Sequence, residues 1–253
     1  MPSSPVPERP WFADDAFWTD YAPLLFGSER WAEVPAVVDS ILALSGTQPG
    51  SAVLDMCCGP GRHALEFASR GHHVVGVDIT GPYIEAARDS ARAMGLSAEF
   101  IQADARTWRR PAAFALAVNL FTSFGYFGSK AEDSLLLERV RESLAPGGVF
   151  VMDLVGKEIA ARDFTEGEWF ERDGRLILTE FTVVGAWEGL RNRWVMGDGD
   201  RRVDRSWVQR LYAATELRDS LIAAGFASVD TFGSWAGAKY GSSAERLIDV
   251  ARV

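Results

Sequence analysis

Acidic and amide side chains stand at or near the ends of successive apolar segments of this sequence. Asp55 lies near the end of the first segment, Asp78 ends the second, Asp104 follows the third and Asn119 lies in the fourth, close to its end. In open parallel sheets, ligands bind at the carboxyl ends of the strands. Carboxylates there can accept ribose hydroxyl and amine groups. These residues therefore predict one polar, ligand-binding edge that suits a nucleoside.

A glycine-rich loop follows the first segment. Gly59, Gly61 and Ala64 match the spacing G-x-G-x-x-G/A, and Asp78 follows at the distance of about 20 residues at which an acid holds a ribose. Glycines let the backbone approach a ligand, and the next helix offers free N–H groups. Asp55 would repel a pyrophosphate and attract an ammonium group, which favours S-adenosylmethionine over a nicotinamide dinucleotide.

Alternating apolar strands and amphipathic helices must position these residues. We expect strands at residues 52–56, 73–78, 99–103, 114–120, 149–154, 228–232 and 247–253. Continuous apolar strands separated by helices predict a parallel sheet covered on both faces. The expected fold is α/β, a doubly wound, mostly parallel Rossmann-like sheet of seven strands with the last one antiparallel.

The periodicity divides the chain into four parts. We predict a disordered tail at 1–12, an N-terminal helical cap segment at 13–48, a Rossmann-like cofactor-binding domain at 49–160 and 211–253, and an inserted antiparallel β segment at 161–210. Turn pairs between β-rich runs, such as Asp173-Gly174 and Glu188-Gly189, indicate the antiparallel strands of the insertion.

Composition excludes several classes of protein. The 253 residues are 47% hydrophobic, too apolar for disorder, yet no apolar run approaches the ~18 residues of a membrane span. The net charge of −9 opposes binding to nucleic acids and anionic membranes. No signal peptide is expected, because the first residues lack a basic start and an apolar core.

Two adjacent cysteines, Cys57 and Cys58, suit a reducing compartment, and a cytoplasmic location is expected. Their spacing does not allow them to share a metal ion, and no metal site is expected.

Four motifs resemble those of class I S-adenosylmethionine-dependent methyltransferases, in their small-molecule branch. They lie at residues 53–61, 75–79, 102–105 and 144–148. The resemblance runs from roughly residue 17 to 155 and resumes from about 211 to the end. It implies S-adenosylmethionine as cofactor and methyl transfer to N, O or C of a small molecule by in-line displacement.

The resemblance also assigns roles to the residues of the cofactor edge. Gly59 and Gly61 would line the methionine end of the cofactor, near Asp55. Asp78 would hold the ribose, and Ile79 would pack on the adenine.

The third and fourth strands would supply further contacts. Asp104 would receive the adenine amino group, and the Ala105 backbone would support the ring. Asn119 would face the reactive methyl group or the methionine part.

The branch also carries an N-terminal helical segment that covers the cofactor. Tyr21, Arg30 and Trp31 are candidates for that lid, with plain aromatic packing as the alternative.

The acceptor site is less defined. Methyltransferases acting on nucleic-acid bases or the glutamine amide commonly carry Asn/Asp-Pro-Pro-Tyr after the fourth strand, whereas this chain has an aromatic loop there. Phe124 and Tyr126 could wall an acceptor pocket, and Arg193 and Arg210 of the insertion are candidates for an anionic substrate group. The insertion would cover the acceptor site or form a dimer contact. No residue is identified as a catalytic base.

The leading hypothesis is a small-molecule methyltransferase, monomeric or homodimeric, with no nucleic-acid or membrane partner. Its alternatives are an RNA or protein methyltransferase, a nicotinamide-dependent oxidoreductase and a non-catalytic cofactor-binding protein.

Overall fold

The structure, a computed structural model, describes residues 10–198 and 201–253, and its centre is a seven-stranded sheet. Its strands, in spatial order, are β10 (Ser228–Phe232), β11 (Leu247–Arg252), β5 (Leu144–Leu154), β4 (Phe114–Asn119), β1 (Ala52–Met56), β2 (His73–Asp78) and β3 (Ala98–Gln102). Only β11 runs antiparallel to its neighbours in this sheet. The predicted doubly wound fold with an antiparallel last strand is confirmed.

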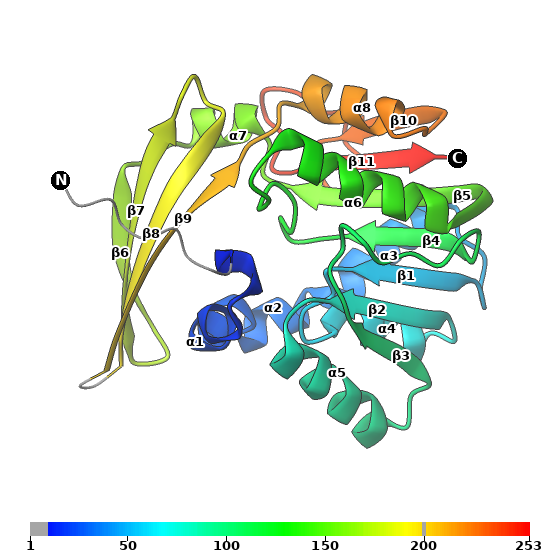
Figure 1. Cartoon of the computed structure of the whole chain (residues 1–253), viewed down its shortest axis with the longest axis horizontal. Coiled ribbons are helices and arrows are strands. Elements are labelled where there is room, and N and C mark those ends of the chain that lie inside the picture. Colours follow the sequence, from blue (N-terminus) through cyan, green and yellow to red (C-terminus); the bar gives the residue numbers. More distant parts are fainter. Residues whose placement is uncertain (1–9, 199–200) are drawn as a thin grey trace.

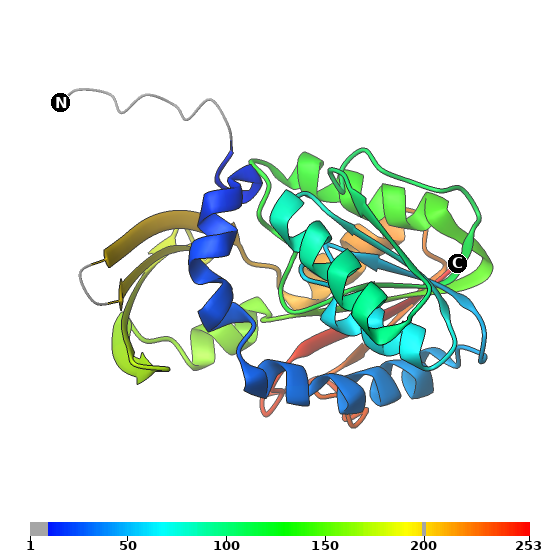
Figure 2. The same ribbon diagram turned by 90° about the horizontal axis from the view of Figure 1, so that it is seen from below.

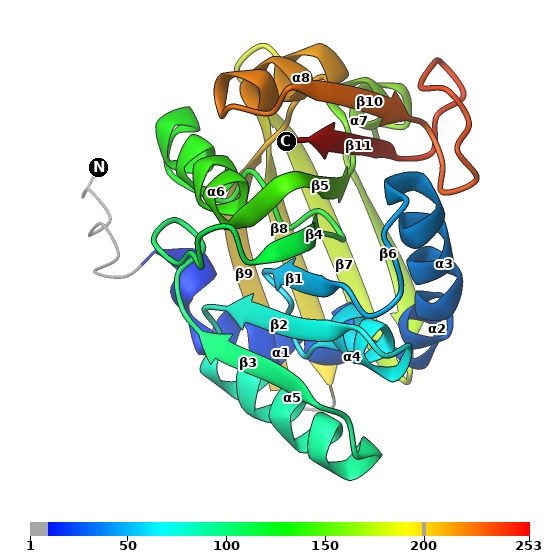
Figure 3. The ribbon, with the colours of Figure 1, turned by 90° about the vertical axis from the view of Figure 1, so that its right-hand side faces the viewer.

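Helices cover both faces of this sheet (Figure 3). One face packs against α3 (Val34–Ser45), α4 (Arg62–Ser69) and α5 (Gly81–Met94), and the other against α6 (Lys130–Ser143) and α8 (Ala214–Ala223). The strands are apolar on both faces because both are buried, which is why they read as continuous apolar runs. A short helix, α7 (Lys157–Arg162), follows β5.

A second, antiparallel sheet of four strands stands beside the first (Figure 1). It consists of β6 (Gly167–Arg172), β7 (Arg175–Val184), β8 (Gly189–Asp198) and β9 (Arg201–Arg210), paired in sequence order. The hairpins predicted in the insertion are therefore present.

Helix α1 (Asp15–Leu25) lies between the two sheets (Figure 2), and α2 (Ser28–Ala32) links it to α3. Phe17 and Tyr21 of α1 share an apolar cluster with Ile177 and Trp207 of the four-stranded sheet. The tail predicted at 1–12 is wrong at its end, because Trp11–Ala13 forms a 3-10 turn in which Phe12 is buried. Residues 1–9 lie outside the described part of the chain.

The segment that connects the small sheet to the large one contacts a buried carboxylate. Asp133 of α6 is fully buried, and its Oδ2 accepts hydrogen bonds from Arg210 Nε at 2.9 Å and the Tyr212 hydroxyl at 2.7 Å. A buried charge needs such partners, because desolvation is costly. The Arg210–Tyr212 segment is thereby fixed to α6.

We expect Asp133→Ala to lower the free energy of unfolding by about 3–5 kcal/mol, because it leaves the Arg210 charge without its partner. Tyr212→Phe removes one hydrogen bond and should cost about 1 kcal/mol. Urea denaturation of both variants measures the difference. Equal losses would show that the ion pair does not fix this junction.

Candidate functional site

A cavity of about 470 Å³ lies between the two sheets. On one side it is lined by the carboxyl edge of the large sheet, including Asp55, Asp78 and Asp104. On the other side it is lined by the small sheet, including Asn192 and Trp194. The volume falls in the range of small-molecule sites.

The glycine-rich loop is held to the second strand by Asp78. Its Oδ2 accepts the Gly59 N–H at 2.8 Å, and its Oδ1 accepts the Thr80 N–H at 2.9 Å. Burial raises the pKa of Asp78, and these N–H groups partly offset that effect. The Asp78 carboxylate thus shapes the loop at the edge of the cavity.

Asp55 and Asn119 are buried, and each has one oxygen atom without a hydrogen-bond partner among the described residues. Asp55 accepts the Ala64 N–H, and Asn119 Nδ2 donates to the Met56 carbonyl at 2.9 Å. Among the described residues, Asp55 Oδ2 and Asn119 Oδ1 have no hydrogen-bond partner. Burial, and then the charge of Asp78, raise the pKa of Asp55 to about 7. Two unpartnered acceptors beside a glycine loop suit a cationic ligand group.

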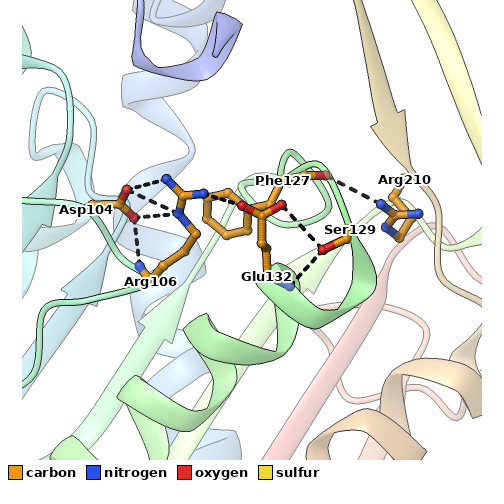
Figure 4. Close-up of polar contacts among 6 residues, drawn as sticks. All are labelled: Asp104, Arg106, Phe127, Ser129, Glu132 and Arg210. Carbon is orange, nitrogen blue, oxygen red and sulfur yellow. Dashed lines mark hydrogen bonds and ion pairs between the residues drawn. The ribbon is translucent and has the colours of Figure 1, made fainter. Parts of the chain in front are cut away.

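Asp104 is engaged by an arginine (Figure 4). Arg106 Nη2 and Nε donate to its Oδ2 at 2.6 and 3.2 Å, and Arg106 Nη1 donates to Glu132 Oε1 at 2.6 Å. Burial acts to raise the pKa of Asp104, but Arg106 outweighs it and the pKa is lowered. Asp104 is therefore an ionised acceptor at the cavity wall.

The predicted site residues divide into two groups. Those that line the cavity are Tyr21, Arg30, Asp55, Gly59, Asp78, Ile79, Asp104, Ala105 and Tyr126. Those that are not part of its lining are Gly61, Trp31, Asn119, Phe124, Arg193 and Arg210. The binding roles of the residues in the first group stay predictions. The residues in the second group lie outside the cavity lining because they contact other parts of the protein or solvent.

Arg193 does not face the cavity, because side chains alternate along a strand. Its neighbours Asn192 and Trp194 line the cavity, so Arg193 points to the outer face, where it pairs with Glu180 at 3.0 Å and Asp204 at 2.8 Å. The prediction that it meets a substrate group is not supported by this geometry.

Arg210 is likewise occupied elsewhere, since it pairs with Asp133, and its Nη2 lies 3.5 Å from the Phe127 carbonyl (Figure 4). Phe124 is buried against Tyr212, with ring centroids 5.1 Å apart. Trp31 is 39% exposed. None of these three side chains is in a position to wall the cavity.

Several lining residues were not predicted. The loop after β4 carries two consecutive residues with left-handed backbone, Phe121 and Thr122, at φ of 59° and 63°. Asp153 fixes them: its Oδ2 accepts the Phe121 N–H at 3.1 Å, and its carbonyl accepts the Thr122 N–H at 3.0 Å. Arg246 donates to both Asp153 oxygens, at 2.6 and 2.7 Å. These residues are far apart in sequence, so no local pattern could have identified them.

Arg62 and the inner face of the small sheet were also missed. Arg62 directly follows the glycine loop, and its position in the G-x-G-x-x-A spacing was the available signal. The buried Thr179 and Asn192 line the small-sheet side, and the buried Trp194 Nε1 has no partner among the described residues.

His63 also lines the cavity. Burial, and then the charge of Arg62, lower its pKa to about 3, so it is neutral and a weak base. The described residues contain no cluster of three His, Cys, Asp or Glu side chains placed to hold a metal ion. Within the same residues, no helix is long and apolar enough to cross a membrane.

Part of the chain is similar to known methyltransferases. Residues 53–148 match the family model described as a methyltransferase domain. The chain is 28% identical over 152 residues to dTDP-3-amino-3,4,6-trideoxy-alpha-D-glucopyranose N,N-dimethyltransferase of Streptomyces venezuelae, covering 60% of this chain. The match spans 62% of that relative, less than two thirds of its length.

Solved structures show the same fold. The chain is similar to an S-adenosylmethionine-dependent methyltransferase of Clostridium acetobutylicum, with a TM-score of 0.78 and 16% identity over 94% of this chain and 98% of the other. It is also similar to an amino pentose methyltransferase of Micromonospora echinaspora with bound S-adenosylmethionine, with a TM-score of 0.68 and 25% identity over 92% and 95%.

The close packing of Gly61 gives a test of the loop. Its φ is +81°, and a Cβ there would lie 2.9 Å from both Ala87 Cβ and Phe100 Cε1. Gly71 has a similar φ of +84° but open space around it. We expect Gly71→Ala to cost about 1–2 kcal/mol of unfolding free energy, and Gly61→Ala about 1–3 kcal/mol more. Thermal and urea denaturation compare the two, and equal costs would contradict the packing argument.

Proposed function

We propose that this chain is a class I S-adenosylmethionine-dependent methyltransferase that transfers the methyl group of this cofactor to a small-molecule acceptor. The match of residues 53–148 to a methyltransferase domain and the similarity to a solved methyltransferase with bound S-adenosylmethionine support the proposal. The observation that carries the proposal is the single cavity into which both the acidic edge of the large sheet and the inner face of the small sheet open. One wall offers cofactor contacts, and the other lies where an acceptor would bind.

The residues present fit the cofactor. Asp55 lines the cavity, and its buried Oδ2 has no hydrogen-bond partner among the residues that the structure describes, so it suits an α-ammonium group. The Asp78 oxygens keep lone pairs for ribose hydroxyls beside their two N–H bonds. We propose that Ile79, Asp104 and Ala105 contact the adenine. When bound, S-adenosylmethionine supplies a sulfonium-activated methyl group.

Aromatic side chains form much of the apolar lining of the cavity. The rings that line it include Trp11, Trp18, Tyr126, Trp194 and Trp207. They exclude water and orient the acceptor, which is what a displacement at an activated methyl group needs from the protein. Because His63 is a weak base, we propose that the acceptor atom enters with a free lone pair.

We propose that the small sheet forms the acceptor wall, since Thr179, Asn192 and Trp194 line the cavity from it. Amino sugars are the acceptors to test first, because the related Streptomyces and Micromonospora enzymes are named for aminodeoxyglucose and amino pentose substrates. A dimer contact through the insertion, a monomeric or homodimeric state, a cytoplasmic location and the absence of a nucleic-acid partner stay predictions.

A labelling experiment tests the activity. The purified protein is incubated with methyl-labelled S-adenosylmethionine and, in separate reactions, a panel of nucleotide-linked amino sugars and bulk tRNA. We expect label in the small-molecule fraction, and calorimetry should show binding of S-adenosylhomocysteine. If S-adenosylhomocysteine does not bind at high micromolar concentration, the proposal is wrong. Label in tRNA would favour an RNA methyltransferase instead.

The raised pKa of Asp55 predicts how cofactor binding depends on pH. In the free protein this carboxyl has a pKa of about 7, above its ordinary 3.8, and Asp78 and Arg62 are the charges acting on it. The protonated form cannot pair with an ammonium group. Affinity for S-adenosylhomocysteine should therefore rise up to about tenfold per pH unit below pH 7 and level off above it.

The Asp55→Asn variant serves as the matched control. It should bind more weakly above pH 7 and lose the pH dependence, as measured by calorimetry between pH 5.5 and 8.5. A variant with the full pH dependence of the unaltered protein would show that another group titrates. The stability of the folded protein changes in the opposite direction. Because the pKa of Asp55 is raised in the folded state, its ionisation lowers the free energy of unfolding as the pH rises from about 4 to 7.

A further inference from the structure

Arg62 is a buried cation that has no anionic partner in the described part of the chain. Its residue is only 4% exposed, yet it forms no ion pair with any residue that the structure describes. Arg246, which also lines the cavity and is more exposed than Arg62, is paired with Asp153. Burying an unpaired charge is costly, so such a group calls for an anion from outside the chain.

The guanidinium group of Arg62 is held in place by aromatic rings. It lies 4.3 Å from the Phe121 ring centroid and 5.9 Å from that of Phe26. Its Nη1 donates to the Arg30 carbonyl at 2.9 Å, the one hydrogen bond it makes to the described residues. A guanidinium has five N–H donors. None of its other nitrogen atoms is among the buried side-chain atoms without a hydrogen-bond partner. Because Arg62 lines the cavity, a ligand can reach these N–H groups.

A second cation stands beside it. The Arg30 guanidinium lies 5.2 Å from the centroid of the same Phe121 ring, and Arg30 also lines the cavity. Burial, and then the charge of Arg30, lower the pKa of Arg62 to about 10, so Arg62 remains charged at neutral pH. Arg30 already pairs with Glu33 at 3.3 Å, so Arg62 is the main anion-binding group and Arg30 adds a second positive charge beside the same ring.

The complementary charge lies nearby. Asp55 accepts the N–H of Ala64, two residues after Arg62, and the charges of Asp55 and Arg62 act on each other. The two side chains nevertheless form no ion pair, and Asp55 Oδ2 is left without a partner among the described residues. An unpaired carboxylate and an unpaired guanidinium at one loop match the two charges of an amino-acid zwitterion.

We propose that Arg62, assisted by Arg30, binds the α-carboxylate at the amino-acid end of S-adenosylmethionine, while Asp55 takes the α-ammonium group. The assignment rests on the proposed function, because it requires that this cofactor is bound. A carboxylate carried by the acceptor has the same chemistry, and the test separates the two sources.

The test compares two ligands that differ by one group. S-adenosylmethionine and its decarboxylated form share the adenosine, the sulfonium and the amine, and only the first has the carboxylate. Calorimetry without acceptor measures both affinities for the unaltered protein and for Arg62→Met. We expect Arg62→Met to bind S-adenosylmethionine about 10- to 100-fold more weakly, the usual range for losing a charged hydrogen bond. Its affinity for the decarboxylated form should change less than about threefold.

Arg172→Met is the matched control, because Arg172 also lines the cavity without an ion pair among the described residues but belongs to β6 of the small sheet. It should leave both affinities unchanged. Arg62→Lys should recover part of the preference for the carboxylate. Thermal denaturation of each variant identifies a folding defect, which would weaken both ligands together.

The outcomes separate the two proposals. If Arg62→Met weakens both ligands equally, or neither, the carboxylate assignment is overturned while the methyltransferase proposal stands. If it changes neither cofactor affinity but raises the KM of an acidic acceptor, the anion belongs to the acceptor and the assignment is likewise overturned. If the unaltered protein binds neither ligand, both proposals fail.

Discussion

Carboxylates buried at the carboxyl edge of the large sheet impose the constraint around which the site is built. The Asp78 oxygens accept hydrogen bonds from the N–H groups of Gly59 and Thr80, and these bonds fix the glycine loop. Asp153 holds the strained Phe121 and Thr122 backbone and is neutralised by Arg246. Each buried charge thus needs a partner from a neighbouring loop, and these pairings position the loops that line the cavity.

Asp55 keeps one buried oxygen, Oδ2, without a hydrogen-bond partner among the described residues. Its position at the end of β1 puts it beside the loop, yet among the described residues only the Ala64 N–H meets it. Among the described residues, Asn119 Oδ1 is also without a partner, so two unpartnered acceptors belong to residues of neighbouring strands, β1 and β4. Of the two, Asp55 lines the cavity, where the glycine loop lets a ligand approach the backbone.

The large sheet could be predicted because its information is local. Strands buried on both faces must be apolar throughout, and the helices between them carry a periodic apolar face, so both could be recognised from short windows. The acidic residues of the cavity followed from the same reasoning, since their place at strand ends depends only on the strand boundaries. The long-range pairs Asp153–Arg246 and Asp133–Arg210 depend on loops far apart in the chain and left no local signal.

The small sheet shows the opposite case. The sequence indicated hairpins but not which face would be inward, because tryptophans and arginines occur at both sets of alternating positions. Trp194 and Trp207 turn toward α1 and the cavity, whereas Trp169 is 70% exposed. The choice is made by packing against Phe17 and Tyr21, residues about 150 or more positions away in the chain. For the same reason, the sequence did not indicate that Arg193 would lie on the outer face, where it pairs with Glu180 and Asp204.

The alternation in β8 separates two kinds of evolutionary freedom. Inward residues such as Asn192 and Trp194 contact the cavity, while the outward Arg193 joins β7 and β9 through Glu180 and Asp204. The inward positions can therefore change without altering the ion pairs of Arg193 on the outer face, and none of them belongs to the glycine loop. On the proposed function, the acceptor side of the cavity can therefore change while the glycine loop and the carboxylates beside it stay the same.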